Sequence, residues 1–341
     1  MRGASMDKTF SLHVKKHDQW LIDTMIAIPK RGKANRVRFR ALSAVRQARL
    51  RFSDPLVCFR MGELRLLLPL SHELPFYRRN LPDYAMNLET VVIIVHAKYR
   101  NLTMIDTGAN VGDSVAVIRA VARVPILCIE GEERFFRLLR VNTMNLVDIE
   151  LEQAFVGAHG DQIDAVHAAH GTAHIELGTP AGGKLRTHTL SEAIDRHPRF
   201  AGSKLLKLDV EGFDCKIISS ESRFLARNKP VVFFEYHPPL CKLAGYDPFP
   251  VFMSLAKIGY SVVAIYENTG RYLFSVELNQ RRVLEDIHAY LVRIGGFCDL
   301  VAFHSEDRDI AESVRKRELD NRANWSIGSD WVNAEECVHA D

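Results

Sequence analysis

Seven short apolar segments, separated by helix-like segments, constrain the fold of this chain more than any other feature. We predict strands at Leu102–Asp106, Ile126–Glu130, Ile149–Val156, Leu205–Val210, Val231–Tyr236, Ser261–Tyr266 and Phe297–His304. Helical patterns fill the intervals, as at Asp113–Ala122, Glu133–Val141 and Asp214–Ala226. Apolar strands that alternate with helices are typical of a mostly parallel sheet covered on both faces. The sequence therefore predicts an α/β protein.

The remaining segments divide the chain into three predicted parts. Residues 1–85 form a basic N-terminal extension, helical over 1–52 and a β-hairpin over 57–70. Residues 86–305 form the sheet domain, which opens with an apolar helix at 86–98 and carries an excursion at 157–184. Residues 306–341 form a C-terminal helix and tail.

Charge is distributed unevenly along the sequence. Residues 1–60 hold 14 Lys and Arg against 4 Asp and Glu, whereas the rest holds 31 against 38. The basic region is either a solvated surface or a docking surface, through residues 1–52, for an anionic membrane or a lipid-diphosphate-linked glycan. Nucleic acid is disfavoured, because few aromatic residues lie among the arginines and the rest of the chain is acidic.

Composition excludes several classes. No apolar run approaches the ~18–20 residues of a membrane span, and charged residues interrupt the N-terminus where a secretory signal would need an apolar stretch. The six cysteines form no CxxC pair, which argues against a zinc ribbon and a disulfide framework. We expect reduced cysteines in a cytoplasmic protein, with attachment to the inner face of a membrane as the variant that the basic region allows.

The most informative motif follows the first of these strands. It runs Asp106-Thr107-Gly108-Ala109-Asn110-Val111-Gly112-Asp113 and opens a helix. A ligand in a parallel sheet binds at the carboxyl ends of the strands, where glycine lets backbone approach it and a helix offers unpaired N–H groups. Glu130 ends the next strand, where a carboxylate accepts ribose hydroxyls. The candidate cofactor-binding residues are Asp106, Gly108, Ala109, Asn110, Gly112, Asp113 and Glu130.

The same loop bears on the identity of the cofactor. A dinucleotide fingerprint needs three glycines, and this loop has only Gly108 and Gly112. Asp106 and Asp113 would repel a pyrophosphate but suit the cationic end of S-adenosylmethionine. The loop therefore favours S-adenosylmethionine over NAD, and a tight turn without ligand is the remaining alternative.

A second group of ionisable residues ends the fourth and fifth of these strands. Lys207, Asp209 and Glu211 alternate along one strand, and Glu235 and His237 end the next. Ionisable groups are rarely buried in a central strand without a partner or a function. The alternative for the first three is an ion-pair network, and for His237 it is a loop histidine that caps local backbone.

In this order the motifs resemble the FkbM family of S-adenosylmethionine-dependent methyltransferases. The resemblance spans roughly residues 100–304. It rests on the Asp106–Asp113 loop, Ile129-Glu130, Asn142 and Asn145, Thr189-Leu190, the Lys207–Gly212 segment, Phe234-Glu235 and the closing strand Cys298–Phe303. Two positions depart from the family pattern: Gly131 stands where proline is frequent, and Ser191 where aspartate is usual.

The resemblance implies a class I methyltransferase, a Rossmann-like, mostly parallel seven-stranded sheet with helices on both faces, here with the N-terminal helical and hairpin extension. It implies that the Gly108–Gly112 loop holds the methionyl part of the cofactor, that Glu130 holds the ribose, and that Asp209 and Glu211 lie at the active centre. Many members of the family act as O-methyltransferases on sugars of polysaccharides, glycolipids or natural products, so the resemblance implies a sugar hydroxyl as the acceptor.

A sugar hydroxyl needs a general base or a metal to lower its pKa. The candidate catalytic residues are Asp209, Glu211 and His237. A base without metal is favoured, and Asp209 and Glu235 would hold Mg²⁺ if the reaction depends on it. His72 is either an acceptor-binding residue or a surface histidine. The alternative functions are an NAD-dependent oxidoreductase and a non-catalytic cofactor-binding partner in a glycan-synthesis complex.

Overall fold

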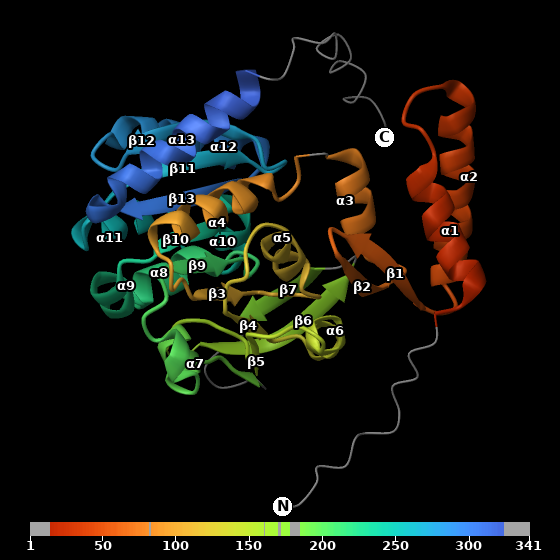
Figure 1. The fold of residues 1–341 in the computed structure, drawn as a ribbon, viewed down its shortest axis with the longest axis horizontal. Helices are drawn as coiled ribbons and strands as arrows, with labels where there is room; N and C mark the ends of the chain where they lie inside the picture. The colour runs from red at the N-terminus through yellow and green to blue at the C-terminus, as the bar shows by residue number, and fades with distance from the viewer. Residues whose placement is uncertain (1–13, 82, 160, 170–171, 178–184, 324–341) are drawn as a thin grey trace, which may run out of the picture.

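A computed structural model describes residues 14–81, 83–159, 161–169, 172–177 and 185–323. Residues 1–13, part of the 157–184 excursion and the tail after residue 323 lie outside the described residues. An eight-stranded sheet with the order β12-β11-β13-β10-β9-β3-β4-β5 forms the centre of the protein (Figure 1). Its strands are β3 (Met104–Thr107), β4 (Ile126–Glu130), β5 (Ile149–Gln153), β9 (Leu205–Leu208), β10 (Val231–Tyr236), β11 (Tyr260–Glu267), β12 (Tyr272–Glu277) and β13 (Cys298–His304).

Strands β5, β4, β3, β9 and β10 are mutually parallel, and β13 pairs antiparallel with β10. Alternate residues of the central strands enter two separate cores, as Leu205 and Leu206 of β9 illustrate. Both faces of the sheet are therefore buried, which explains the apolar strands. The chain reverses its order at β3 and β9, and a parallel sheet binds ligands in the crevice outside such a switch point.

Helices cover both faces of this sheet. One core contains residues of α4 (Met86–Lys98), α5 (Asp113–Val121), α6 (Glu133–Thr143) and α13 (Arg308–Ala323). The other core contains residues of α7 (Leu190–Asp195), α8 (Asp214–Ser220), α9 (Ser222–Asn228), α11 (Val251–Lys257) and α12 (Arg281–Ile294). None of the helices in the described ranges combines the length and hydrophobicity of a membrane span.

The N-terminal part extends one core rather than forming its own. It consists of α1 (Lys16–Ala27), α2 (Lys33–Leu50), the hairpin β1 (Leu56–Met61) and β2 (Leu64–Pro69), and α3 (Leu74–Asn80). Leu21, Val57 and Leu68 belong to the same buried cluster as the sheet residue Met104. Asn142 of α6 accepts a hydrogen bond from the backbone N–H of Leu67 and donates to the carbonyl of Val111, so it joins the hairpin to the loop after β3.

The expected sheet is confirmed except in strand number: it has eight strands, not seven. The additional strand is β12, an edge strand in which mainly Tyr272 and Val276 face the core. Its other positions are polar or only partly covered, and the apolar Leu273 and Phe274 are exposed. The helix expected over 214–226 is two helices, α8 and α9. Part of the 157–184 excursion forms β6 (Gln162–Ala169) and β7 (Thr172–Leu177), which with β8 (Leu185–Arg186) make a small antiparallel sheet. A short helix, α10 (Pro238–Leu243), follows β10.

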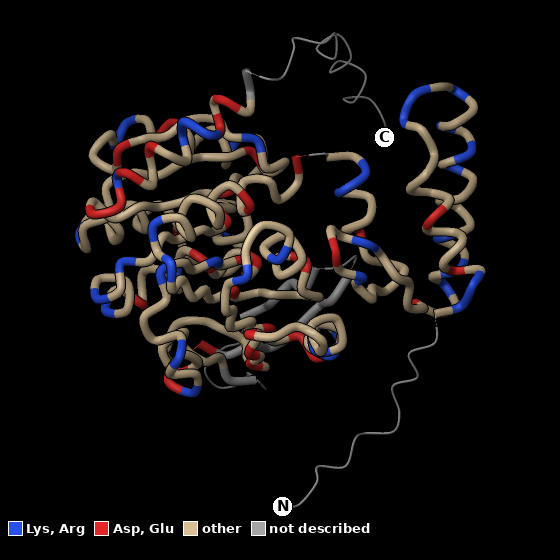
Figure 2. The backbone as a smooth tube through the Cα atoms, in the orientation of Figure 1, with Lys and Arg blue, Asp and Glu red and all other residues tan. Residues whose placement is uncertain are grey.

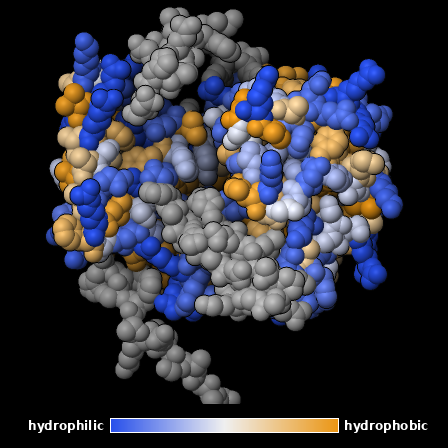
Figure 3. Space-filling view, turned by 180° about the vertical axis from the view of Figure 1, so that it is seen from behind, coloured by the Kyte–Doolittle hydropathy of each residue, from blue (hydrophilic) through white to orange (hydrophobic). Residues whose placement is uncertain are grey.

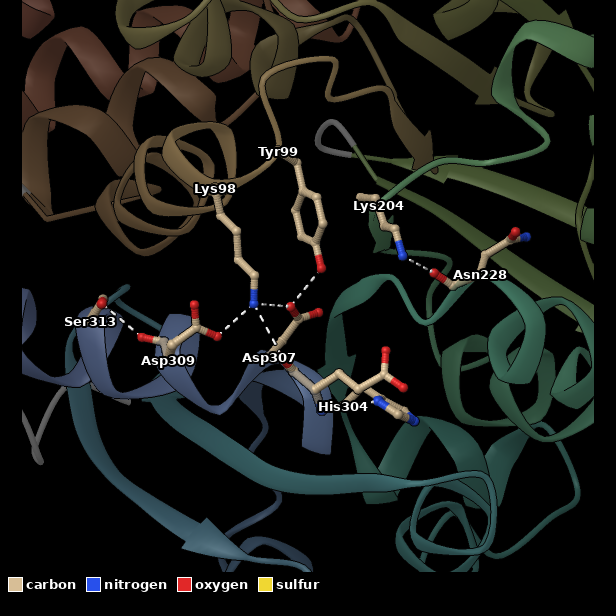
Figure 4. A network of polar contacts seen from close by, with 9 residues as sticks. Lys98, Tyr99, Lys204, Asn228, His304, Asp307, Asp309 and Ser313 are labelled. Carbon is tan, nitrogen blue, oxygen red and sulfur yellow. Dashed lines mark hydrogen bonds and ion pairs between the residues drawn. The ribbon is translucent and has the colours of Figure 1, made fainter.

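The buried carboxylate of Asp307, directly before α13, bonds to side chains at the end of α4 (Figure 4). Oδ1 of Asp307 accepts from Nζ of Lys98 over 2.8 Å and from the hydroxyl of Tyr99 over 2.6 Å. Asp307 is 1% exposed. We expect Asp307→Asn to lower the free energy of unfolding by about 2 kcal/mol, because the charged acceptor of two hydrogen bonds is lost. Urea unfolding measures this, and Asp309→Asn is the control: its carboxylate also pairs with Lys98 but its side chain is 65% exposed, so its loss should cost less than about 1 kcal/mol.

Candidate active site

A pocket of about 420 Å³ lies at the carboxyl ends of β3, β4, β9 and β10. Its floor is formed by the loop after β3 and by the residues that end β4 and β9. Its opposite wall comes from the N-terminal part, through α3 and the segment that leads into α4. Figure 3 shows the surface hollowed between the N-terminal helices and the sheet domain. The volume falls in the range of small-molecule sites.

The loop after β3 brings its backbone onto the neighbouring strand end. Gly108 has φ +79°, and a Cβ there would lie 1.8 Å from the carbonyl oxygen of Asp209. Only glycine can occupy this position. Gly108 and Ala109 donate their N–H groups to the carbonyl of Ile129, and Gly112 precedes the first turn of α5 with φ +90°. Of the loop residues proposed from sequence, Gly108, Asn110 and Asp113 line the pocket, whereas Asp106, Ala109 and Gly112 support it from behind.

Glu130 ends β4 with its carboxylate held in place by two backbone groups. The N–H of Asn110 donates to Oε2 over 2.9 Å and the N–H of Glu132 donates to Oε1 over 2.7 Å. Asn110 adopts φ +48°, a conformation that non-glycine residues seldom take. Burial raises the pKa of Glu130 to about 7, although these hydrogen bonds oppose the shift. The carboxylate that sequence analysis assigned to the ribose therefore faces the pocket in a fixed orientation.

Lys207 is the buried cation of the site. Its Nζ lies 3.3 Å from Oδ1 of Asp106 and 3.1 Å from Oδ2 of Asp209. Burial would lower the pKa of Lys207, but the carboxylates of Asp106, Asp209 and Asp113 hold it well above its usual value. The ion-pair network considered from sequence thus exists, and it also keeps one carboxylate in the pocket, because the Asp209 side chain is half exposed.

Glu211 lies at the sharp turn after β9. Its φ is +51°, and Gly212 follows with φ +89°. Residues held in this region cost of order 1–3 kcal/mol and cluster at functional sites. Burial, followed by the charges of Asp209 and Glu130, raises the pKa of Glu211 to about 7.

Carboxyl groups dominate the pocket lining. In the described part of the chain, the lining contains one lysine or arginine, Lys207, against the carboxyl groups of Asp113, Glu130, Asp209, Glu211, Glu235 and Asp299. Burial is the main reason that the pKa of Asp299 rises to about 7 and that of Glu235 rises well above its usual range. Such a wall repels anions and favours a cationic ligand.

His72 is part of this wall and not a surface residue. It is 7% exposed, and burial lowers its pKa to about 4, so its ring is neutral. Nδ1 accepts from the N–H of Leu74 over 3.2 Å, which leaves the proton on Nε2, 3.4 Å from Oδ1 of Asn110. His72 therefore connects the N-terminal part to the loop after β3.

His237 does not join the other candidates in the pocket lining. Its Nδ1 accepts from the N–H of Leu240 at the start of α10, and its ring stacks on Phe297 with centroids 5.0 Å apart. This is the capping role considered from sequence. Within the described ranges, no group of three or more His, Cys, Asp or Glu side chains is arranged to hold a metal ion.

The two departures from the family pattern have local structural reasons. A Cβ at Gly131 would lie 2.2 Å from the ring of Phe155, so this aromatic residue occupies the space that a side chain would need. Ser191 donates from its hydroxyl to Glu221 at the start of α9, away from the pocket. Neither departure removes a group from the pocket lining.

The structure adds lining residues that sequence reasoning missed. Asp299 of β13 accepts from Nδ2 of Asn87 over 2.8 Å. The argument that selected Lys207, an ionisable residue in an apolar strand, applies equally to Asp299. Thr107 and the aromatic residues Tyr77, Tyr84 and Phe155 carried no such signal, because they lie in the lining only through tertiary packing.

The strand order, with β13 antiparallel beside β10, and the pocket at the switch point define a class I methyltransferase fold. Residues 106–262 match the family model described as the methyltransferase FkbM domain. The match begins at Asp106 in β3, includes β4, β9 and β10, and ends in β11.

Solved structures show distant likeness. The methyltransferase FkbM from Methylobacillus flagellatus KT is 13% identical, with a TM-score of 0.34 over 60% of this chain and 44% of that one. The precorrin-6y C5,15-methyltransferase from Geobacter metallireducens GS-15 is 14% identical, with a TM-score of 0.33 over 63% of this chain and 86% of that one. An O-methyltransferase from Bacillus cereus, in complex with SAH, is 9% identical, with a TM-score of 0.32 over 64% of this chain and 80% of that one. No curated protein matches the sequence significantly.

Proposed function

We propose that this protein transfers a methyl group from S-adenosylmethionine to a hydroxyl of a sugar-containing acceptor. The observation that carries the proposal is the acidic pocket at the switch point of an FkbM methyltransferase domain, floored by the Gly108 loop and Glu130. Hydride transfer with NAD is disfavoured by the same carboxylates, which would face a pyrophosphate.

The residues present fit the proposed cofactor. Its ribose hydroxyls would donate to Glu130, which two backbone N–H groups already orient. Its cationic amino-acid end would lie by Gly108, Asp113 and Asp209, where the lining is acidic. Beside Gly131, the ring of Phe155 offers an aromatic surface for the adenine of the cofactor. When bound, S-adenosylmethionine supplies an activated methyl group with a neutral leaving group.

The chain's own contribution is alignment and proton removal. We assign proton acceptance to Glu211, because a base is most effective when its pKa lies near the working pH, and that of Glu211 is raised to about 7. Lys207 pairs with Asp209 over 3.1 Å and so fixes the position of this carboxylate beside Glu211. The acceptor would enter between Tyr77, Tyr84 and Asp299, where aromatic rings and hydrogen-bonding groups suit a sugar.

Calorimetric titration with S-adenosylmethionine, S-adenosylhomocysteine and NAD⁺ tests the cofactor. Micromolar binding of the two adenosyl ligands alone supports the proposal, and binding of NAD⁺ in their place overturns it. Turnover of a hydroxylated sugar acceptor with and without EDTA then separates metal-free from Mg²⁺-dependent transfer.

Affinity for S-adenosylhomocysteine is expected to increase by up to about tenfold between pH 6 and pH 8. The pKa of Glu130 is about 7 in the free protein, and ribose hydroxyls bond more strongly to the ionised form. Binding at low pH must first remove a proton, so it is weaker. Glu130→Gln should bind weakly at both pH values. If Glu130→Gln keeps the full pH dependence of binding, that dependence comes from another carboxyl group.

A further inference from the structure

A second pocket, of about 260 Å³, lies on the opposite side of α3 from the methyl-transfer pocket. Its lining comes from the turn between α1 and α2, the first half of α2 and the end of α3. The lining residues are Pro29, Lys30, Asn35, Arg36, Phe39, Arg40, Arg79 and Asn80. Figure 2 shows lysine and arginine at the α1–α2 turn, along α2 and near the end of α3.

Among the described residues, this lining carries four cations and no carboxylate. None of Lys30, Arg36, Arg40 and Arg79 forms an ion pair with an acidic side chain of the described residues. Like charges placed this close repel one another. Helix α2 adds to the repulsion, because it has no acidic residue in its first turn, where its dipole is positive. The positive charge gathered here would be balanced by a bound anion.

Part of this charge is fixed by packing. Arg79 donates to the carbonyl of Ile28 over 2.8 Å and to Oδ1 of Asn80, and its guanidinium lies 4.6 Å from the centre of the Phe39 ring. Lys30 donates to the carbonyl of Asn80 over 3.2 Å. These contacts hold the turn, α2 and α3 together around a concave site, at whose edge the exposed Arg36 and Arg40 lie.

We propose that this pocket binds a phosphate group. A phosphate carries up to two negative charges and three acceptor oxygens, and arginine side chains bind it in bidentate geometry. A carboxylate would balance fewer of the four charges. The inference does not depend on the methyl-transfer chemistry, and the same phosphate chemistry is found in a lipid headgroup and in a soluble sugar phosphate.

Titration of the full chain with inorganic diphosphate at low salt tests the site. We expect saturable one-to-one binding that Arg36→Ala weakens at least tenfold. Arg38→Ala is the matched control, because it removes the same charge from the same helix outside the pocket, and it should change affinity less than threefold. Equal loss in both variants, or no saturable binding by the unmodified chain, overturns the proposal. Unchanged thermal unfolding of both variants shows that the fold is intact.

The source of the phosphate follows from two further arms. The first is flotation with vesicles that contain phosphatidic acid. A lipid headgroup is identified if flotation is lost in Arg36→Ala, is retained in Arg38→Ala and is competed by diphosphate. Binding of glucose 1-phosphate with the same dependence on Arg36, and no flotation, identifies a soluble phosphate ester. Flotation or sugar-phosphate binding that ignores Arg36 would exclude the pocket as the phosphate site.

Discussion

Glu211→Gln is expected to lower kcat by about 10²- to 10⁴-fold, the usual contribution of a general base. The affinity for S-adenosylmethionine should stay within a few fold, because the amide keeps the size of the side chain. In the unmodified enzyme, kcat should rise with pH through about 7, as Glu211 loses its proton. That rise should be absent in the variant. Initial rates from pH 5.5 to 8.5 measure both effects.

Asp209→Asn is the comparison that decides which carboxylate takes the proton. It removes the partner of Lys207 but leaves Glu211 in place. If this variant loses the pH dependence while Glu211→Gln keeps it, Asp209 is the base and our assignment is wrong. Full activity in both variants, with acceptor turnover established, would move proton removal elsewhere.

Lys207→Met should produce the largest loss of stability, about 3–5 kcal/mol in the free energy of unfolding, because it leaves buried carboxylates without their cation. Asp106 is fully buried, and burial already raises its pKa. A carboxyl group with a raised pKa stabilises the fold at low pH and loses this contribution as pH rises through its folded pKa. The deficit should therefore be larger at pH 8 than at pH 5, as measured by urea unfolding.

Lys229→Met provides the control. Its lysine pairs with the exposed Glu306, so its loss should cost under about 1 kcal/mol and vary little with pH. Adding Asp106→Asn to Lys207→Met should recover part of the lost stability. A Lys207→Met protein as stable as the control at pH 8 would show that the ion-pair network does not hold the strand ends together.

Sequence predicted the parts of the fold that are buried on both faces. Strands β4 and β10 are apolar except at Glu130 and Glu235 near their carboxyl ends, so hydrophobicity located them. Strand β12 was missed although Tyr272, Leu273 and Phe274 form a short apolar run; it is an edge strand in which Leu273 and Phe274 are exposed. Helix α3 was also missed, since seven residues with an early proline give no clear helical period.

The floor of the site was predictable because parallel strands end on one edge. Gly108, Glu130, Asp209 and Glu211 were therefore placed together from sequence, and the structure brings them into one pocket. The opposite wall of the pocket was not predictable, because Tyr77 and Tyr84 reach the pocket through the packing of the N-terminal part on the sheet domain. His237 lies next to the strand end in sequence, yet Pro238 begins a helix that turns its ring onto Phe297.

The two walls of the methyl-transfer pocket come from separate stretches of the chain, and this separates two evolutionary pressures. Residues that would hold the methyl donor lie on the strand ends, where a change disturbs the central sheet. Those that would choose the acceptor include Tyr77 and Tyr84, outside the sheet and outside the 106–262 family match. If the proposed function holds, a substitution in this opposite wall would change the contacts to the acceptor and leave the strand ends that would hold the methyl donor in place.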